Sequence, residues 1–177
     1  MPNYKTDQFV TQPIERVFAF FCDPQNLILV TPPSLNAKIE SEKIILPSHS
    51  NPAGNRCAIT GSQFTVSLNL LPHLPVRVKW MARIVQWELN RFFCDTQVNG
   101  QVFRHWYHCH RFRAEQRPAG MGTLITDDVD FDTGKGGLVN AIAAAGIKQT
   151  FAYRRKAVEE FFTEEPAQAK LRPQSLG

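Results

Sequence analysis

The sequence predicts a single α+β domain in which an antiparallel sheet wraps around one long C-terminal helix. Three observations favour this class: a short helical hairpin follows the first strand, about six strand-like segments then succeed one another without helices between them, and the last structured segment is one long helix. Consecutive strands without crossover helices must be antiparallel. The long helix is the only element large enough to cover the apolar face of the sheet, and a curved sheet around one helix leaves a cavity.

The first elements are a strand and two short helices. Residues 4–11 are predicted as the first strand, and Pro13 suits the first position of a helix. Asp23-Pro24 breaks that helix and begins a second one over residues 25–30. The apolar residues that follow Pro13 at helical spacing are Ile14, Val17, Phe18 and Phe21.

Alternation of apolar and polar residues predicts the strands that follow. The clearest case is the segment 76–84, where Arg77, Lys79 and Arg83 alternate with apolar side chains. A loop is expected over residues 47–55, and Asn99-Gly100 is expected to form a tight turn. The predicted strands cover residues 35–42, 64–70, 76–84, 91–98, 103–115 and 122–132.

The last predicted element is a long amphipathic helix over residues 138–162, free of proline and rich in alanine. The glycine-rich run 134–137 before it lacks the spacing of a phosphate-binding loop and is interpreted as a flexible lead into the helix. Arg154 and Arg155 are expected to divide between an ion pair at the sheet edge and solvent. Residues 1–163 are thus predicted as one domain and residues 164–177 as a disordered tail.

Composition narrows the cellular context and the partners. Twenty basic and sixteen acidic side chains give a net charge of +4, too mild an excess to predict a nucleic-acid partner. No apolar run is long enough for a transmembrane segment, and no signal peptide is evident, so a cytoplasmic location is expected. The four cysteines form no CxxC pair, which favours buried free thiols over a zinc site or a disulfide framework.

Five motifs carry a resemblance to a known superfamily, and the resemblance covers the chain from about Lys5 to Phe162. They are Pro13-Ile14-Glu15-Arg16-Val17-Phe18, Thr31-Pro32-Pro33-Ser34-Leu35, Leu74-Pro75-Val76, Trp106-x-His108-x-His110-x-Phe112 and Phe151-Ala152-Tyr153-Arg154. With these motifs the chain resembles the helix-grip superfamily of START, birch-pollen-allergen and polyketide cyclase/dehydrase domains (SRPBCC proteins), and within it a bacterial cyclase/dehydrase-like, ligand-binding subgroup. The resemblance implies a helix-grip fold with an internal cavity. The chain departs from the usual pattern of the superfamily at two places. The loop 47–55 is long, and Gln101-Val102 replaces the proline that usually follows Gly100.

The parity of the strands predicts which polar side chains face this cavity. Arg111 and Arg113 point one face of their strand toward water, so His108 and His110 should lie on the opposite, inner face. The same argument, applied to the neighbouring strands, adds three further polar residues, Asp95, Gln97 and Asp127. A mostly apolar cavity with a few convergent polar groups is the usual form of a small-molecule site.

The sequence therefore predicts a protein that binds a hydrophobic or amphipathic small molecule of the lipid, quinone, polyketide or isoprenoid class, without a cofactor. The polar head of the ligand would be oriented by Asp95, Gln97, His108, His110 and Asp127. The apolar walls would be formed by Trp80, Ile84, Phe93, Trp106, Phe112 and Phe151.

Four alternatives remain open for the same residues. The polar groups could simply satisfy one another, for example through a hydrogen bond from His110 to Asp127. The same pair could act as the acid and base of a cyclase/dehydrase-like enzyme, although no Ser or Cys nucleophile is placed beside it. The His-x-His pair with Asp95 or Asp127 could hold a metal, a weak signal at this spacing. Finally, the predicted basic outer face could serve as an interaction module, with Arg77, Lys79, Arg83, Arg111 and Arg113.

Overall fold

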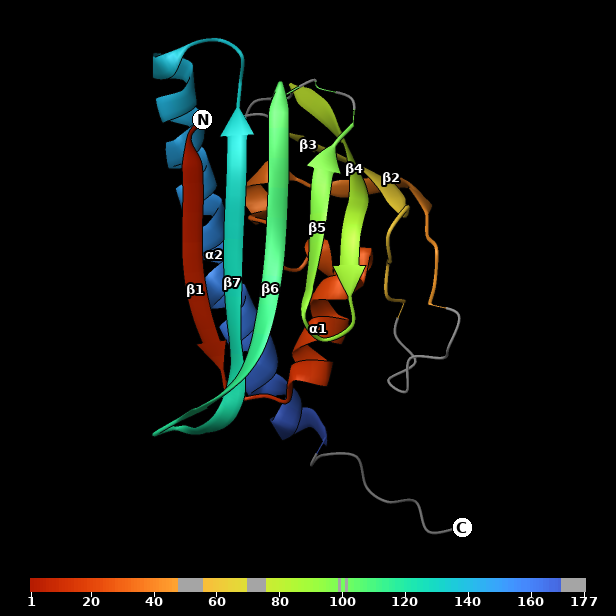
Figure 1. The fold of residues 1–177 in the computed structure, drawn as a ribbon, viewed down its shortest axis with the longest axis vertical. Coiled ribbons are helices and arrows are strands. Elements are labelled where there is room, and N and C mark those ends of the chain that lie inside the picture. Colours follow the sequence, from red (N-terminus) through yellow and green to blue (C-terminus); the bar gives the residue numbers. More distant parts are fainter. Residues whose placement is uncertain (48–55, 70–75, 99, 101, 170–177) are drawn as a thin grey trace.

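The computed structural model describes residues 1–47, 56–69, 76–98, 100 and 102–169, with side chains described as far as residue 163. Seven strands form one antiparallel sheet in the order β1-β7-β6-β5-β4-β3-β2 (Figure 1). This confirms the predicted α+β helix-grip fold. The strands are β1 (Asn3–Val10), β2 (Lys38–Lys43), β3 (Gln63–Asn69), β4 (Arg77–Glu88), β5 (Phe92–Gln97), β6 (His105–Arg117) and β7 (Gly120–Asp132).

Helix α1 (Ile14–Cys22) has a strongly apolar inner face. This face packs against the sheet, and the end of the helix lines the cavity described below. The Phe18 ring packs edge-on against Phe93 and Phe112 and lies at a tilt against Trp87. These contacts join α1 to the inner face of the sheet. The prediction of a helical hairpin is correct in outline, but the second helix is the shorter 3₁₀ helix η1 (Pro24–Leu27).

A second 3₁₀ helix, η2 (Pro33–Leu35), was not predicted and shortens the next strand. Pro32 before it and Pro33 at its first position favour a helical start, and Asn36 ends it with a φ of 45°, in the left-handed region that asparagine tolerates. Strand β2 consequently begins at Lys38, three residues later than the alternating pattern indicates.

The long helix α2 (Gly137–Ala169) runs across the inner face of the sheet, behind β1, β7 and β6 in the view of Figure 1. One side of it buries Ile147, Phe151, Val158 and Phe162. The helix continues past Phe162 to Ala169, so the first six residues of the expected disordered tail, 164–169, are helical. Residues 170–177 of that tail, most of the expected loop 47–55, and Asn99 of the expected turn lie outside the described residues.

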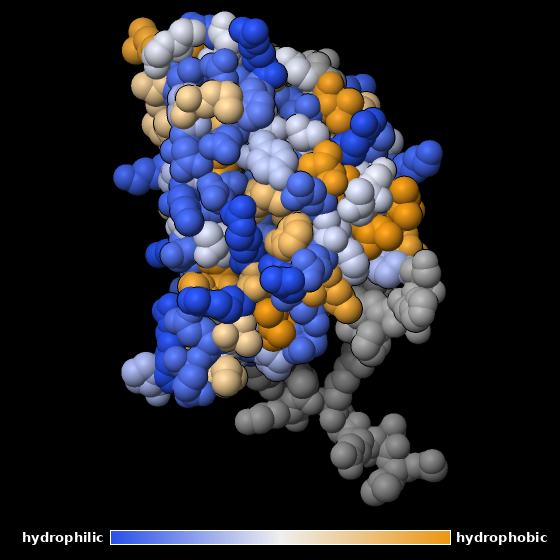
Figure 2. Space-filling model, in the orientation of Figure 1, coloured by the Kyte–Doolittle hydropathy of each residue, from blue (hydrophilic) through white to orange (hydrophobic). Residues whose placement is uncertain are grey.

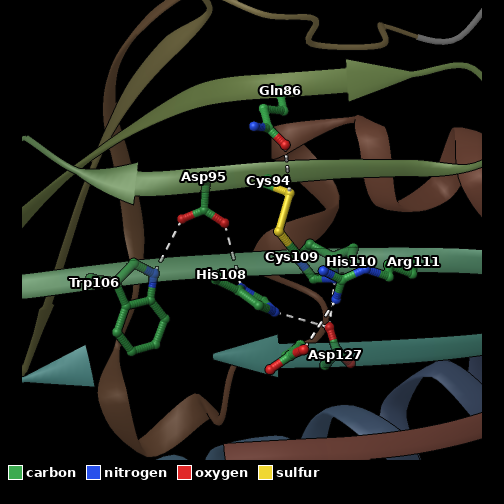
Figure 3. The surroundings of a disulfide bond; sticks show 10 residues. Gln86, Cys94, Asp95, Trp106, His108, Cys109, His110, Arg111 and Asp127 are labelled. Atoms are coloured by element: carbon green, nitrogen blue, oxygen red, sulfur yellow. Dashed lines mark hydrogen bonds and ion pairs between the residues drawn. A yellow bond between two sulfur atoms is a disulfide. The ribbon is translucent and has the colours of Figure 1, made fainter. Parts of the chain in front are cut away.

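The cysteines contradict the prediction of four free thiols. Cys94 on β5 stands directly opposite Cys109 on β6, with their Cα atoms 4.1 Å apart, and the two form a disulfide on the outer face of the sheet (Figure 3). Cys22 and Cys57 are free and buried, as expected. Sequence spacing does not reveal which residues of two strands stand opposite each other, and the pairing was missed for this reason. Because disulfides persist mainly in oxidising compartments, the cysteines no longer support a cytoplasmic location, which stays a prediction.

No helix in the described parts of the chain combines the length and the apolar character needed to cross a membrane.

Candidate functional site

A cavity of about 600 Å³ lies between the inner face of the sheet, the α1–η1 segment and helix α2. Its volume is within the roughly 300–1,000 Å³ of typical small-molecule sites. Eight of the residues predicted to bind the ligand line this cavity: Trp80, Ile84, Phe93, Asp95, Trp106, His108, His110 and Phe151. Phe20, Phe21 and Leu27 from the helical hairpin add to its apolar wall and were not predicted.

Three of the predicted residues do not line the cavity. Phe112 packs into the core against Phe18 and Phe21, where α1 covers the end of β6. Gln97 accepts a hydrogen bond from the backbone N–H of Phe103 at 3.1 Å and so holds the chain that follows β5. Asp127 is buried behind the two histidines. Strand parity places a residue on a face, but it does not say which residues on that face are covered by a helix.

The polar side chains form one connected cluster (Figure 3). The register of the sheet places Asp95 opposite His108, and His110 opposite Asp127. Trp106 donates its indole N–H to Oδ1 of Asp95 at 3.3 Å, and Nδ1 of His108 lies 3.4 Å from Oδ2 of Asp95. Oδ1 of Asp127 lies 3.0 Å from Nε2 of His108 and 2.6 Å from Nδ1 of His110. His108 thus bridges two carboxylates, while Nδ1 of His110 is close to Asp127 but not aligned for a hydrogen bond.

The two histidines differ in their preferred charge state. Burial opposes the charged form of His108, but its contacts with Asp127 and Asp95 outweigh this and raise its pKa. Burial, together with the nearby charge of His108, lowers the pKa of His110 to about 4. Burial would raise the pKa of Asp127, but the two imidazoles hold it well below the usual range. The cluster therefore favours a protonated His108 between two carboxylates, beside a neutral His110.

Three charged residues line the cavity without having been predicted there: Asp23, Lys135 and Arg154. Arg154 lines the cavity from α2, whereas the adjacent Arg155 donates to the backbone carbonyl of Asp7 at the edge strand β1. The expected division between the two arginines is therefore only partly right: Arg155 is exposed at the sheet edge, but none of the described carboxylates forms an ion pair with it. The sequence contained a signal for the inward position of Arg154: residues 147, 151, 154 and 158 follow one another at steps of three and four, which places them on one side of the helix.

Three of the side chains could hold a metal ion. The donor atoms of Asp95, His108 and His110 all lie within 4.8 Å of one another. Two features oppose a cation at this position: the pKa of His108 is raised, which favours its protonated form, and the guanidinium of Arg154 lines the same cavity.

The outer face of the sheet is mixed in charge rather than uniformly basic. Arg111 pairs with Asp128 at 3.2 Å, and Glu115 pairs with both Arg113 and Arg117 at 2.7 Å. Figure 2 shows mainly hydrophilic side chains over β1, β7 and β6. Acidic partners within the sheet thus neutralise part of the predicted basic face, which weakens the case for an interaction module there.

The low pKa of His110 predicts that stability falls as the pH drops from 6.5 to 5. In this range the unfolded chain takes up a proton on His110, whose ordinary pKa is 6.5, while the folded protein resists protonation down to about 4. The unfolded state then binds more protons and is favoured, by about 1.5 kcal/mol from this residue. His108, Asp127 and Arg154 are the charged groups that act on His110.

Urea unfolding at pH 6.5 and pH 5 measures this effect. The difference in the free energy of unfolding between the two pH values should be smaller in His110→Gln than in the wild type. His105→Gln, on the opposite face of the same strand, should leave the difference unchanged. An identical pH dependence in His110→Gln and the wild type would contradict the assignment.

Comparisons with known proteins add evidence for the fold. No protein-family model and no curated protein matches the chain. Among solved structures, protein Ms6760 from Mycobacterium smegmatis is 13% identical over 92% of each chain, with a TM-score of 0.63. Ara h 8.0201 is 15% identical over 92% of this chain and 98% of its own chain, with a TM-score of 0.60.

A nucleoside-diphosphate sugar epimerase from Corynebacterium glutamicum is 21% identical over 95% of this chain but only 31% of its own, with a TM-score of 0.65. At these identities the likeness shows a shared fold. The shared fold agrees with the resemblance to the helix-grip superfamily, while the cyclase/dehydrase-like subgroup stays a prediction.

Proposed function

We propose that the protein binds a hydrophobic or amphipathic small molecule, of the lipid, quinone, polyketide or isoprenoid class, inside the cavity between the sheet and α2. The observation that carries this proposal is the cavity itself, about 600 Å³ in volume and lined mainly by apolar side chains. Burial of an apolar ligand there would remove apolar surface from water on both partners, at roughly 25 cal/mol per Å².

The aromatic side chains support an apolar or planar occupant. Trp80 packs edge-on against both Trp106 and Phe103, with ring centroids 4.7 and 5.6 Å apart. Phe151 from α2 packs edge-on against His108 at 5.4 Å and thereby connects the apolar wall to the polar cluster. A ligand with an apolar body and one polar end fits this division.

An environment-sensitive neutral dye, Nile red, provides the test. The wild type should bind the dye with increased fluorescence. Phe151→Asp should weaken binding about tenfold or more because it places an unpaired charge in an apolar wall. The matched control is Ala152→Asp, which puts the same charge on the exposed side of the same helix.

A second variant covers the case in which Phe151→Asp does not fold. A Cβ added at Gly146, which lines the cavity, would meet no atom of another element within 4 Å, so Gly146→Phe should fold and fill part of the space. Dye binding at wild-type affinity in folded Gly146→Phe and folded Phe151→Asp would remove the cavity as the binding site.

The runner-up function is a cyclase/dehydrase-like enzyme, favoured by the contact between His110 and Asp127. Two features make it the second choice. A base with a pKa of about 4 is a weak proton acceptor at neutral pH. Cys22 lines the cavity, but burial and its neighbour Cys57 raise its pKa, so it stays a thiol rather than a nucleophilic thiolate.

A further inference from the structure

We propose that the polar end of the ligand is a carboxylate, and that Arg154 binds it. This inference rests on the proposed function and adds to it the chemical class of the ligand head group: an apolar chain ending in an acid.

Arg154 lines the cavity, where its guanidinium lies beside an aromatic ring. Its guanidinium carbon lies 4.7 Å from the centre of the Phe151 ring, and its buried Nε has no hydrogen-bond partner. Among the described side chains, none of the carboxylates forms an ion pair with it. A guanidinium carries five N–H donors and stays charged in proteins, and this half-buried one has donors, the buried Nε among them, that need acceptors.

The nearby carboxylates are already engaged with other side chains. Asp95 contacts Trp106 and His108, and the single oxygen Oδ1 of Asp127 contacts both His108 and His110. They act on Arg154 only through their longer-range charge. Arg154, beside this cluster, consequently retains hydrogen-bonding capacity toward the cavity that it lines.

The shape and charge of the site favour one kind of acceptor. The flat, forked guanidinium matches a carboxylate with two parallel hydrogen bonds. Asp95 and Asp127 already place two negative charges near Arg154. Their repulsion is larger for a doubly charged phosphate than for a singly charged carboxylate, so a monovalent acid suits the site better. The mainly apolar remainder of the cavity suits the hydrocarbon part of such a molecule.

Competition against Nile red with two chain-matched probes, dodecanoate and methyl dodecanoate, tests this inference. The wild type should bind the acid at least about tenfold more tightly than the ester, corresponding to one charge-assisted pair. Arg154→Met should lose this preference for the acid while binding the ester within about twofold of the wild type. Arg154→Lys keeps the charge but not the fork, and should bind the acid with intermediate affinity.

Lys156→Met is the matched control because it removes one positive charge from an exposed position on the same helix. It should bind both probes as the wild type does. Equal affinity of the wild type for acid and ester would overturn the inference, and this comparison requires no variant to fold. Unchanged binding of the acid by Arg154→Met would overturn the inference as well. If Nile red and both probes fail to bind the wild type, the proposed function itself fails.

Discussion

Replacing Asp127 by alanine is expected to lower the free energy of unfolding by about 3–5 kcal/mol, the usual cost of removing one partner from a buried ion pair. Asp127 is buried, and Oδ1 contacts both imidazoles of the cluster, at 3.0 and 2.6 Å. Without it, the protonated His108 would retain only Asp95, at 3.4 Å. Urea unfolding near pH 6 measures the loss.

Two further variants identify the cause of the loss. Asp127→Asn keeps the size and one acceptor but removes the charge, so it should lose most of the same stability if charge is the reason. Asp130→Ala, on the opposite face of the same strand, removes a carboxylate that accepts an exposed hydrogen bond from Asn3 at 2.9 Å. That control should cost less than about 1 kcal/mol. A loss for Asp127→Ala no larger than that of the control would contradict the role assigned to the cluster.

Strand parity in the sequence was sufficient to predict the core of the site. Residues 106, 108 and 110 have the parity opposite to that of the outward-facing Arg111 and Arg113, and the structure places all three on the cavity wall. The order of elements likewise predicted the antiparallel sheet and the long helix that covers it. Both inferences depend on local periodicity, which a single sequence contains.

The features that were missed depend on how distant segments meet. The bridge between Cys94 and Cys109 requires the register of β5 and β6, which the pattern of residues within each strand does not specify. Arg154 was assigned to the surface or a sheet edge because its charge was given more weight than its place on the buried side of α2. Whether Asp127 lines the cavity or lies behind the histidines depends on their side-chain packing.

The disulfide is expected to contribute about 3 kcal/mol to stability, because it closes a short loop in the unfolded chain. Cys94→Ala/Cys109→Ala should lose this amount in urea unfolding, and the wild type should lose a similar amount when a reducing agent is added. Adding the reductant to the double variant should have no further effect.

The same bridge stands next to the site, since the pair Asp95 and His108 and the pair Phe93 and His110 flank it in the register of β5 and β6. We expect Nile red binding to persist after reduction, because β6 stays paired with β7 along its whole length and keeps both histidines on the inner face. A thiol titration of the denatured, unreduced protein should find two reactive thiols, Cys22 and Cys57. Finding all four would show that the bridge does not form. In that case the reductant should leave the stability of the wild type unchanged, as it leaves that of the double variant.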